Sequence, residues 1–337
     1  MSFVVRTATA SDLQPMYEMA KLTGGGFTNL PPDRGSLAAK LERSQAACQV
    51  AQDQLKDELF VLVLENTETG EVRGTGQLFT QVGQNWPFYS YRLTLHTQHS
   101  RELQRTVRAE LLSLVTDLEG ASEVGGLFLH PSQRAGGLGL LLARSRYLFV
   151  AGHRARFGQR ILAELRGIID ERGGSPFWDA VGGRFFGMSF QEADSFNALN
   201  GNQFIADLMP KHPVYTAMLP ESAAQVIGLP HPTGRAAMRM LENEGFAYEG
   251  FIDIFDGGPT MIARTDAVAS IRGAVAAPVV ETALEIGEKA LLAAGRLGDF
   301  RCCFGARAMH DGGVAIDSRA AELLRVSEGD VVWSVPR

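Results

Sequence analysis

The stretch from residue 124 to residue 146 constrains the fold of this chain more than any other part. Residues 126–130 (GLFLH) predict a buried strand, residues 138–149 predict a helix, and the glycine-rich segment 131–139 lies between them. A turn of this kind lets successive backbone N–H groups point at one spot, and the dipole of the following helix adds partial positive charge there. The sequence therefore predicts a cradle for an anionic group, and a pyrophosphate is its natural occupant.

The pattern of this cradle separates it from other glycine turns. Arg134, Gly137 and Gly139 form R-x-x-G-x-G, whereas a Rossmann turn has G-x-G-x-x-G near the start of the chain and a P-loop has Gly-Lys-Ser/Thr. The pattern resembles the signature of the GNAT acyltransferase fold, and a plain structural turn is the alternative that the motif alone leaves open. Arg144 and Arg146 offer further positive charge, and helical phase decides whether they reach the ligand.

Length and charge narrow the class of protein. The chain has 337 residues, 45% of them apolar and 21% charged, with a formal net charge of −6. This length exceeds the usual size of a single core, so we expect one large unit with a second or appended domain. The acidic balance argues against broad binding to nucleic acid or to an anionic membrane. The polar start of the chain is unlike a signal peptide, and no apolar run approaches the roughly 20 residues that span a bilayer, so we expect a cytoplasmic protein.

Cysteine and histidine usage predicts no metal site. Cys48, Cys302 and Cys303 show no zinc-type spacing, and the adjacent pair is poorly placed for a disulfide. Six histidines also lack the spacing of metal ligands and are interpreted as structural or surface residues: His96, His99, His130, His153, His212 and His310.

Hydrophobic patterns and turn residues predict the elements before the cradle. We expect strands at 3–5, 59–65, 72–81 and 89–96, and helices starting near 11 and covering 33–49 and 101–118. The glycine run 24–26 either ends the first helix or brings backbone amides close to a ligand.

The same patterns divide the rest of the chain. We expect strands at 160–168, 204–208 and 246–255, helices at 176–181 and 234–244, and a turn leading into a strand over 324–333. The predicted domains are 1–200, a second unit 201–267 that completes the active site, and a small β-rich unit 268–337.

Longer blocks of sequence resemble the arginine N-succinyltransferase family, over residues 3 to about 270 and only loosely in the tail. The blocks are Thr23-Gly-Gly-Gly-Phe-Thr-Asn-Leu-Pro31, Tyr91-Arg92, Leu127-Phe-Leu-His-Pro131, Ser175-Pro-Phe-Trp178, Arg184-Phe-Phe-Gly-Met188, Leu208-Met-Pro-Lys-His-Pro213, Glu244-Gly-Phe246 and Ile252-Asp-Ile-Phe-Asp-Gly-Gly-Pro-Thr260. The resemblance implies a mixed α/β, GNAT-like acyltransferase fold with a partial second GNAT-like half and a small β-rich C-terminal appendage.

The resemblance also implies a reaction and site residues. That family moves a succinyl group from succinyl-CoA, a co-substrate rather than a tightly bound cofactor, to the α-amine of arginine. The family's proton donor matches His231 in Gly228-Leu-Pro-His-Pro232, and its acyl-CoA contact matches Leu127. Pro230 departs from the family pattern and removes one backbone N–H beside His231. The resemblance further implies an oligomer, formed with a second copy or with a related chain.

Amide formation from a thioester needs a neutral amine, a stabilised oxyanion and a protonated or tolerated thiolate. The strand residues Leu127, Phe128 and Leu129 can offer backbone N–H groups to the thioester oxygen. His231, with an ordinary pKa of about 6.5, could act as acid toward the CoA sulfur or as base toward the amine. The alternative is that His231 is a structural residue in a turn, between two prolines.

The two substrates make opposite electrostatic demands. A guanidinium favours a carboxylate, for which Asp253 and Asp256 are candidates, although both can equally cap the end of a strand. The succinyl carboxylate needs a cation, for which Arg92 or Lys211 could serve. Two other functions stay open: acylation of ornithine or another basic amino acid, and the role of a weakly active partner subunit in a hetero-oligomer.

Overall fold

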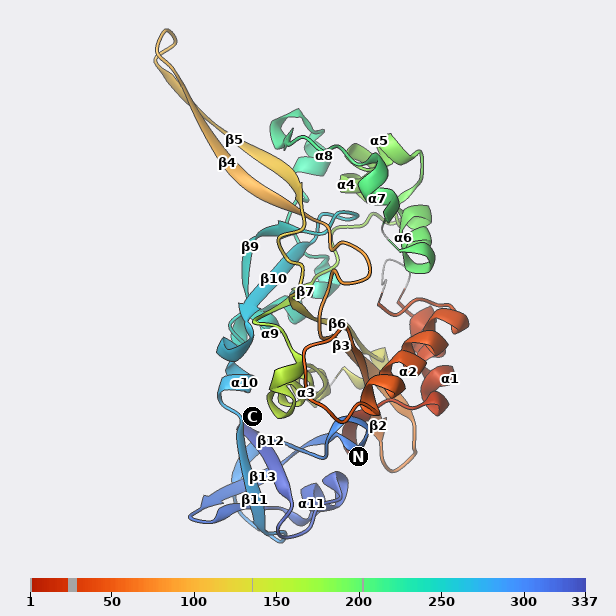
Figure 1. Cartoon of the computed structure of the whole chain (residues 1–337), viewed down its shortest axis with the longest axis vertical. Coiled ribbons are helices and arrows are strands. Elements are labelled where there is room, and N and C mark those ends of the chain that lie inside the picture. Colours follow the sequence, from red (N-terminus) through yellow and green to blue (C-terminus); the bar gives the residue numbers. More distant parts are fainter. Residues whose placement is uncertain (1, 24–28, 135, 202) are drawn as a thin grey trace.

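One sheet of fifteen strands runs through the described residues of the computed structural model, which are 2–23, 29–134, 136–201 and 203–337 (Figure 1). The strands in spatial order are β12 (Glu288–Ala294), β15 (Val331–Pro336), β11 (Val275–Glu281), β14 (Gly313–Ile316), β13 (Arg301–His310), β1 (Phe3–Thr7), β2 (Leu59–Asn66), β3 (Val72–Phe79), β6 (Ser122–Leu129), β7 (Arg160–Glu164), β10 (Pro259–Arg264), β9 (Ala247–Ile252), β4 (Ser90–Ser100), β5 (Arg105–Val115) and β8 (Val214–Tyr215).

The α-helices of the described residues are α1 (Leu13–Lys21), α2 (Arg34–Cys48), α3 (Leu138–Gly152), α4 (Pro176–Ala180), α5 (Gly183–Phe186), α6 (Phe190–Asn200), α7 (Gln203–Leu208), α8 (Glu221–Ala224), α9 (Arg235–Asn243), α10 (Ala269–Arg272) and α11 (Ser318–Leu324). None of these helices combines the length and the apolar character needed to cross a membrane.

Helices cover both faces of the central strands. On β2, Val61 and Val63 pack with α1 and α2, whereas the alternate residues Leu62 and Leu64 pack with α3. A strand buried on both faces needs apolar residues at every position. This explains why β2 is an unbroken apolar run and why the sheet divides α1 and α2 from α3.

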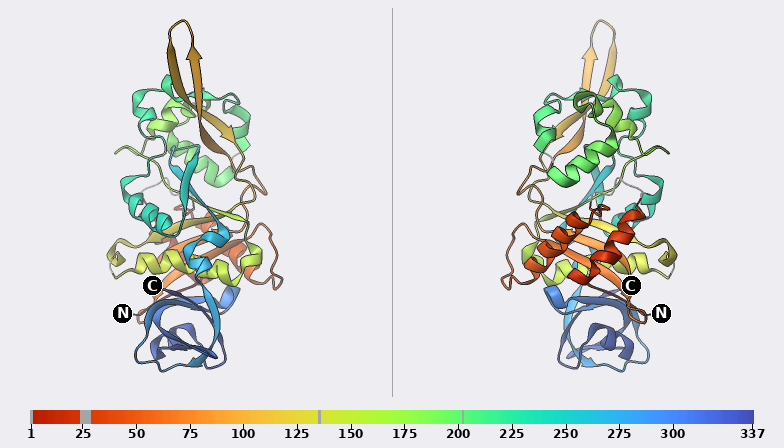
Figure 2. Two further views of the ribbon diagram at one scale, coloured as in Figure 1. Left: turned by 90° about the vertical axis from the view of Figure 1, so that its left-hand side faces the viewer. Right: turned by 90° about the vertical axis from the view of Figure 1, so that its right-hand side faces the viewer.

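The C-terminal strands close into a small barrel (Figure 2). β12 pairs with both β13 and β15, which completes a ring of β12, β15, β11, β14 and β13 with α11 beside it. The barrel joins the main sheet through β1, where Val5 lies opposite Cys302. The predicted fold class, a mixture of helix and strand with a β-rich C-terminal region, is confirmed.

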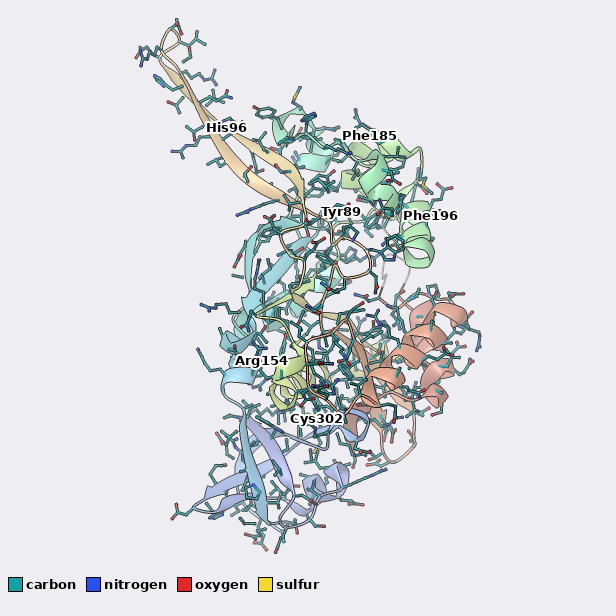
Figure 3. All side chains as sticks on the ribbon, viewed as in Figure 1. Tyr89, His96, Arg154, Phe185, Phe196 and Cys302 are labelled. Atoms are coloured by element: carbon teal, nitrogen blue, oxygen red, sulfur yellow. The ribbon has the colours of Figure 1, made fainter. Side chains whose placement is uncertain are left out.

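The helix expected at 101–118 is wrong. This stretch forms β5, which pairs with β4 along its full length, from Ser90 opposite Val115 to Ser100 opposite Arg105. The two strands form an arm that projects beyond the body, and His96 lies out on it (Figures 1 and 3). Pairing with β4 provides the backbone hydrogen bonds of β5, so no helix is needed. The apolar residues at helical spacing in this stretch therefore predicted the wrong secondary structure.

The strand expected at 204–208 is also wrong, because this segment is α7. Ile205 and Met209 lie four residues apart, are both buried in the cluster around Trp178, and are joined by the bond from Met209 N–H to Ile205 C=O, which is 2.9 Å long. Spacing of four residues places side chains on one face of a helix. Burial of that face therefore favours a helix over a strand in this segment.

The remaining expected helices and strands are confirmed, with ends shifted by a few residues. α1 ends at Lys21, and the glycine run 24–26 lies outside the described residues. β10, which belongs to the predicted unit 201–267, pairs with β7 of the unit before it. The sheet is therefore continuous across residue 200, and the predicted domain boundaries stay predictions.

Candidate functional site

A wedge-shaped opening separates β6 and β7, the two parallel strands that α3 connects. β6 and β7 pair only at their starts, where Ser122 lies opposite Ile161 and Glu123 opposite Leu162. β6 continues to Leu129 without a further strand partner on that side among the described residues. Backbone groups on this edge of β6 are therefore available to an extended ligand, because an unpaired strand edge offers N–H and C=O groups.

A bulge lies in β6 within this wedge. Thr75 of β3 faces Phe128 and Gln77 faces Gly125, so Gly76 alone lies opposite both Gly126 and Leu127. Gly126 has a φ of +56°, a left-handed conformation that glycine adopts without strain. A bulge turns backbone groups out of the ladder. The Leu127 region is thus where a backbone N–H can leave the sheet and face a ligand.

The three predicted strand residues contribute differently. The side chains of Leu127 and Leu129 pack against the core beneath α3, and that of Phe128 packs toward α1 and α2. Their side chains are therefore committed to the two cores, and their offer to a ligand is the backbone.

The glycine cradle lies at the end of the wedge, where β6 passes into α3. Gly136 and Gly137 have φ values of +71° and +81°, and Gly137 is the N-terminal cap of α3. The first intrahelical bond runs from Leu141 N–H to Gly137 C=O, so the first-turn amides, including that of Gly139, have no acceptor within the helix. Arg134 precedes this turn and is exposed. Gly137 and Gly139 thus lie at the helix N-terminus where the sequence placed an anion.

The two other predicted cations of this region are occupied elsewhere. Arg144 pairs with Glu244 at 3.1 Å, and Arg146 is buried and donates to the carbonyls of Ala143 and Gly125. Arg337, which the sequence analysis missed, instead approaches the cradle from the barrel, with Nη2 3.4 Å from the carbonyl oxygen of Gly136. Nothing local in the sequence signals this contact, because it depends on how the barrel docks.

His231 lies at the wedge, on the edge of β7. The N–H of Leu165 bonds to Pro259 of β10, and adjacent residues of a strand direct their backbone groups to opposite edges. The carbonyl of Arg166 therefore faces the other edge, and it accepts from the His231 N–H at 2.7 Å. The side chain of His231 is consequently held beside the opening between β7 and β6.

The local turn fixes the tautomer of His231. Its Nδ1 accepts from the backbone N–H of Thr233 at 3.3 Å and lies 2.7 Å from the Thr233 hydroxyl. Because a backbone N–H can only donate, the neutral ring carries its proton on Nε2. Partial burial and the nearby Arg166 guanidinium lower the pKa of His231. The free nitrogen is thus a donor.

His130 has the same turn at the end of β6. Its Nδ1 accepts from Ser132 N–H at 3.3 Å and lies 2.7 Å from the Ser132 hydroxyl. Its backbone N–H, however, bonds to Arg73 of β3 and not to the β7 side of the wedge. Position in the sheet, and not local structure, distinguishes the two His-Pro turns.

Buried carboxylates gather on one face of the sheet beside the wedge. Burial, then the neighbouring carboxylates of Asp253 and Glu123, raises the pKa of Glu164 well above its usual range. Glu123 accepts from Asn29 at 3.0 Å, and burial raises its pKa as well. No hydrogen bond to the Glu164 carboxylate comes from the described part of the chain. Lys40 lies near Glu123 and partly offsets the effect of burial on its pKa. Because burial disfavours the ionised carboxyls, a cation bound beside them would favour their ionisation.

The two predicted aspartates differ in how far turn structure uses them. Asp256 accepts from the N–H groups of Gly167 and Gly258, one on each oxygen, so its carboxylate holds the turn after β9. Asp253 accepts from Phe255 and Asp256 N–H groups on Oδ1 alone. Burial raises the pKa of both carboxyls. The two carboxyls also share a side-chain hydrogen bond, so turn structure uses both of them, Asp256 more fully than Asp253.

The structure does not bring Arg92 or Lys211 into this cluster as a free cation. Arg92 is exposed, pairs with Asp117 at 3.0 Å and lies over the ring of Phe251. Lys211 is exposed on the loop after α7.

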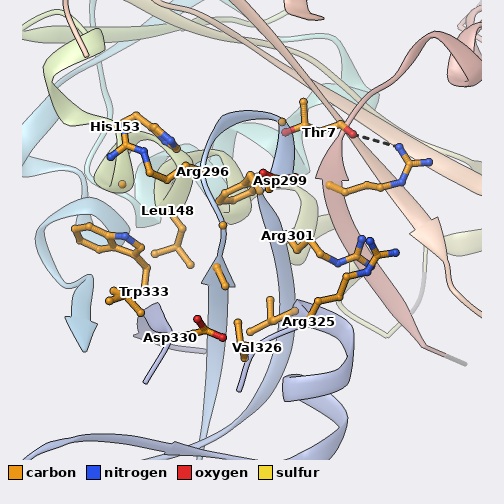
Figure 4. A pocket seen from close by; sticks show the side chains of 18 of the residues that line it. Thr7, Leu148, His153, Arg296, Asp299, Arg301, Arg325, Val326, Asp330 and Trp333 are labelled. Atoms are coloured by element: carbon orange, nitrogen blue, oxygen red, sulfur yellow. Dashed lines mark hydrogen bonds between the residues drawn. The ribbon is translucent and has the colours of Figure 1, made fainter. Parts of the chain in front are cut away.

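A cavity of about 790 Å³ lies away from the wedge, between the barrel, β1 and the end of α3 (Figure 4). Arg301 and Arg325 lie side by side in it, and Arg6 on its wall pairs with Asp12 and Glu65. None of the residues predicted to bind ligand lines this cavity. Among the described residues, no group of His, Cys, Asp and Glu side chains could hold a metal ion.

Comparison with known proteins gives concordant matches. The family described as arginine N-succinyltransferase beta subunit matches residues 3–270, and the C-terminal domain of that subunit matches residues 272–336. The chain is 44% identical to the arginine N-succinyltransferase of Salmonella schwarzengrund (strain CVM19633) over 271 residues, 80% of this chain and 78% of that protein. The corresponding enzyme of Escherichia coli (strain K12 / DH10B) is 43% identical over the same shares. The solved structure of arginine/ornithine succinyltransferase subunit AI from Pseudomonas aeruginosa is 33% identical, with a TM-score of 0.89 over 99% of this chain and 98% of that one.

Proposed function

Because the chain belongs to the arginine N-succinyltransferase family, we propose that it transfers the succinyl group of succinyl-CoA to the α-amine of L-arginine. The observation that carries this proposal is the wedge between β6 and β7, with a bulge at Gly126 and Leu127 and a helix N-terminus at its end. An acyl-CoA has an extended arm that suits a free strand edge and a pyrophosphate that suits a helix N-terminus.

The chemistry can then be divided among named groups. The backbone N–H near Leu127 stabilises the oxyanion, and the Glu164 carboxylate accepts the proton that the amine loses on attack. The C–N bond forms, the C–S bond breaks, and CoA departs as a thiolate that accepts a hydrogen bond from Nε2–H of His231, while the amine proton stays on Glu164 until it passes to solvent. Direct attack requires both substrates to be bound together, which the adjacency of the wedge and the acidic cluster supports.

The acidic cluster supports a basic amino acid as acceptor. Glu123, Glu164 and Asp253 are carboxyls whose ionisation burial disfavours, and a bound guanidinium or ammonium would favour their ionised forms. The Pseudomonas relative is an arginine/ornithine succinyltransferase subunit, so ornithine is the alternative substrate. Mass spectrometry of the product formed from succinyl-CoA in an equimolar mixture of the two amino acids tests the proposal. N-succinylated arginine is expected as the main product. Succinylated ornithine as the main product would show that ornithine is the substrate.

Assembly with a second chain is part of this proposal. The β4–β5 arm exposes Leu95, Leu103 and Val107, and a two-stranded ribbon is marginally stable alone in water. We propose that a second copy or a related chain packs on the arm. Activity of the purified chain by itself decides between an enzyme and a weakly active partner subunit.

Arg337 gives a prediction about the cradle. Replacing Arg337 with alanine should raise KM for succinyl-CoA about three- to five-fold at low salt and leave kcat unchanged, because an exposed cation beside a phosphate contributes modestly. The increase should shrink in high salt, since exposed charges are screened. Initial rates at two ionic strengths measure this effect. An unchanged KM at low salt would show that Arg337 only packs against Phe304.

A further inference from the structure

We propose that Arg166 binds the free carboxylate of the succinyl group and so selects a dicarboxylic acyl chain over a neutral one. This inference rests on the proposed succinyl transfer, and it adds a specificity residue that the sequence analysis did not find. The sequence offered Arg92 and Lys211 for this carboxylate, and both lie on exposed positions.

Arg166 lies at the correct level of the wedge. Glu123 and Leu162 are paired, and Leu127 on β6 and Arg166, two residues past the end of β7, each follow four residues later. The two residues therefore flank the opening at about the same depth, apart from the one-residue bulge in β6. The carbonyl of Arg166 also holds the backbone of His231 at 2.7 Å. An acyl group whose thioester lies at Leu127 is thus bounded by Arg166 on the opposite strand.

The guanidinium of Arg166 makes no ion pair in the described part of the chain, although Asp256 and Asp194 are near enough for their negative charge to act against the lowering of its pKa by burial. Its Nε is buried and has no hydrogen-bond partner, and neither an ion pair nor a side-chain hydrogen bond joins the group to another described residue. Asp256 forms no hydrogen bond with the guanidinium, and its two oxygens accept from the N–H groups of Gly167 and Gly258. A half-buried guanidinium with an orphaned N–H is unfavourable unless a ligand completes it.

Other buried arginines of the chain show the contrast. Arg156 has its full set of partners, Asp53, Glu58 and the carbonyl of Val50. Arg146, the arginine beneath β6, donates to two backbone carbonyls. Of these three buried or half-buried guanidiniums, Arg166 is the one that donates no hydrogen bond to another described residue. A planar guanidinium matches a carboxylate in a bidentate pair.

Charge balance favours the succinyl carboxylate over the α-carboxylate of the amino acid. The acceptor enters as a cation toward Glu123, Glu164 and Asp253, whereas Arg166 lies on the strand that flanks the acyl arm. A negative charge on the acyl chain is what distinguishes succinyl-CoA from other acyl-CoA molecules. The free cation beside the thioester therefore matches the acyl chain.

The test compares succinyl-CoA with butyryl-CoA, which has a chain of similar length and no carboxylate. In R166Q, kcat/KM for succinyl-CoA should fall about 10- to 100-fold, the range expected for losing charge-assisted hydrogen bonds, and kcat/KM for butyryl-CoA should change less than about two-fold. R166K should recover part of the preference, because a point charge replaces the planar pair. R160Q, at the half-buried start of β7, is the matched control and should keep the preference.

Several outcomes would overturn the inference. An equal fall in kcat/KM for both acyl-CoA substrates would assign Arg166 a structural role. If that equal fall disappears when agmatine, which lacks the α-carboxylate, replaces arginine, Arg166 binds the α-carboxylate of the amino acid instead. Binding of free CoA to R166Q reports whether that variant is folded. If R166Q is unfolded, the ratio of kcat/KM for succinyl-CoA to kcat/KM for butyryl-CoA is measured in R166K instead. Full retention of the succinyl preference in R166K would contradict a bidentate pair. A wild-type chain that releases no CoA from succinyl-CoA with any amino acid would contradict the proposed function itself, and that result is separate from the variant comparison.

Discussion

Replacing His231 with alanine should lower kcat for succinyl transfer about 100- to 1,000-fold, the usual contribution of a preorganised hydrogen-bond donor to a developing negative charge. The reason is geometric: the Thr233 N–H occupies Nδ1, so the proton available to the CoA thiolate is the one on Nε2, and the bond to Arg166 holds the ring at the wedge. Binding of free CoA should change little, since the cradle is formed by Gly137 and its neighbours.

His130 provides the matched control for this variant. It forms the same His-Pro turn with the same contact to a hydroxyl, but on the β3 side of β6. H130A should therefore keep kcat close to the wild-type value while H231A loses it. Steady-state kinetics with both substrates, together with calorimetric binding of free CoA, measures the difference. Equal kcat values for H231A and the wild type would remove His231 from the chemistry.

Replacing Glu164 with glutamine should lower kcat at neutral pH by about 100-fold or more, because glutamine cannot accept a proton from the amine. Burial and the neighbouring Asp253 and Glu123 carboxylates raise the pKa of Glu164, so the wild-type rate should increase as pH rises through that raised value. The variant should lose this dependence on pH. A pH–rate profile for both proteins tests it, and an unchanged profile in E164Q would assign the base elsewhere.

The same variant should be more stable than the wild type at neutral pH. A carboxyl whose pKa is raised in the folded state binds its proton more tightly there, so its ionisation destabilises the fold as pH rises above the unfolded value of about 4.3. E164Q should therefore unfold about 2 °C or more higher at pH 7 to 8, and this gain should disappear below about pH 4, where the carboxyl is protonated in both states. A lower midpoint for E164Q at pH 7 would show that the Glu164 charge stabilises the fold.

The cradle could be predicted from the sequence because its signal is local. A strand, a glycine turn and a helix follow one another within residues 126–149, and the backbone conformation at Gly137 is one that glycine adopts without strain. The arm formed by β4 and β5 could not be predicted in the same way. Its conformation depends on pairing between two strands and not on one segment's own periodicity.

The chemistry of the site depends on contacts that no local pattern carries. Glu123, Glu164 and Asp253 come from three strands or their ends, and strand register brings them together. Taken alone, each is an acid near the end of an apolar run. The histidines make the same point, since His130 and His231 share one turn and differ only in the strand beside them. In the sequence, only the resemblance to the family distinguished His231 as a catalytic candidate from His130.

Release of free CoA from succinyl-CoA by the purified chain, followed as a function of arginine concentration, tests the central claim most directly. Transfer at the β6–β7 wedge predicts that CoA is released only when the amine is present, in equal amount to the succinylated amino acid, with initial rates that depend on both substrates as a ternary complex requires. Absence of CoA release with arginine, ornithine and every other amino acid tested would contradict the assignment of this chain as an N-succinyltransferase.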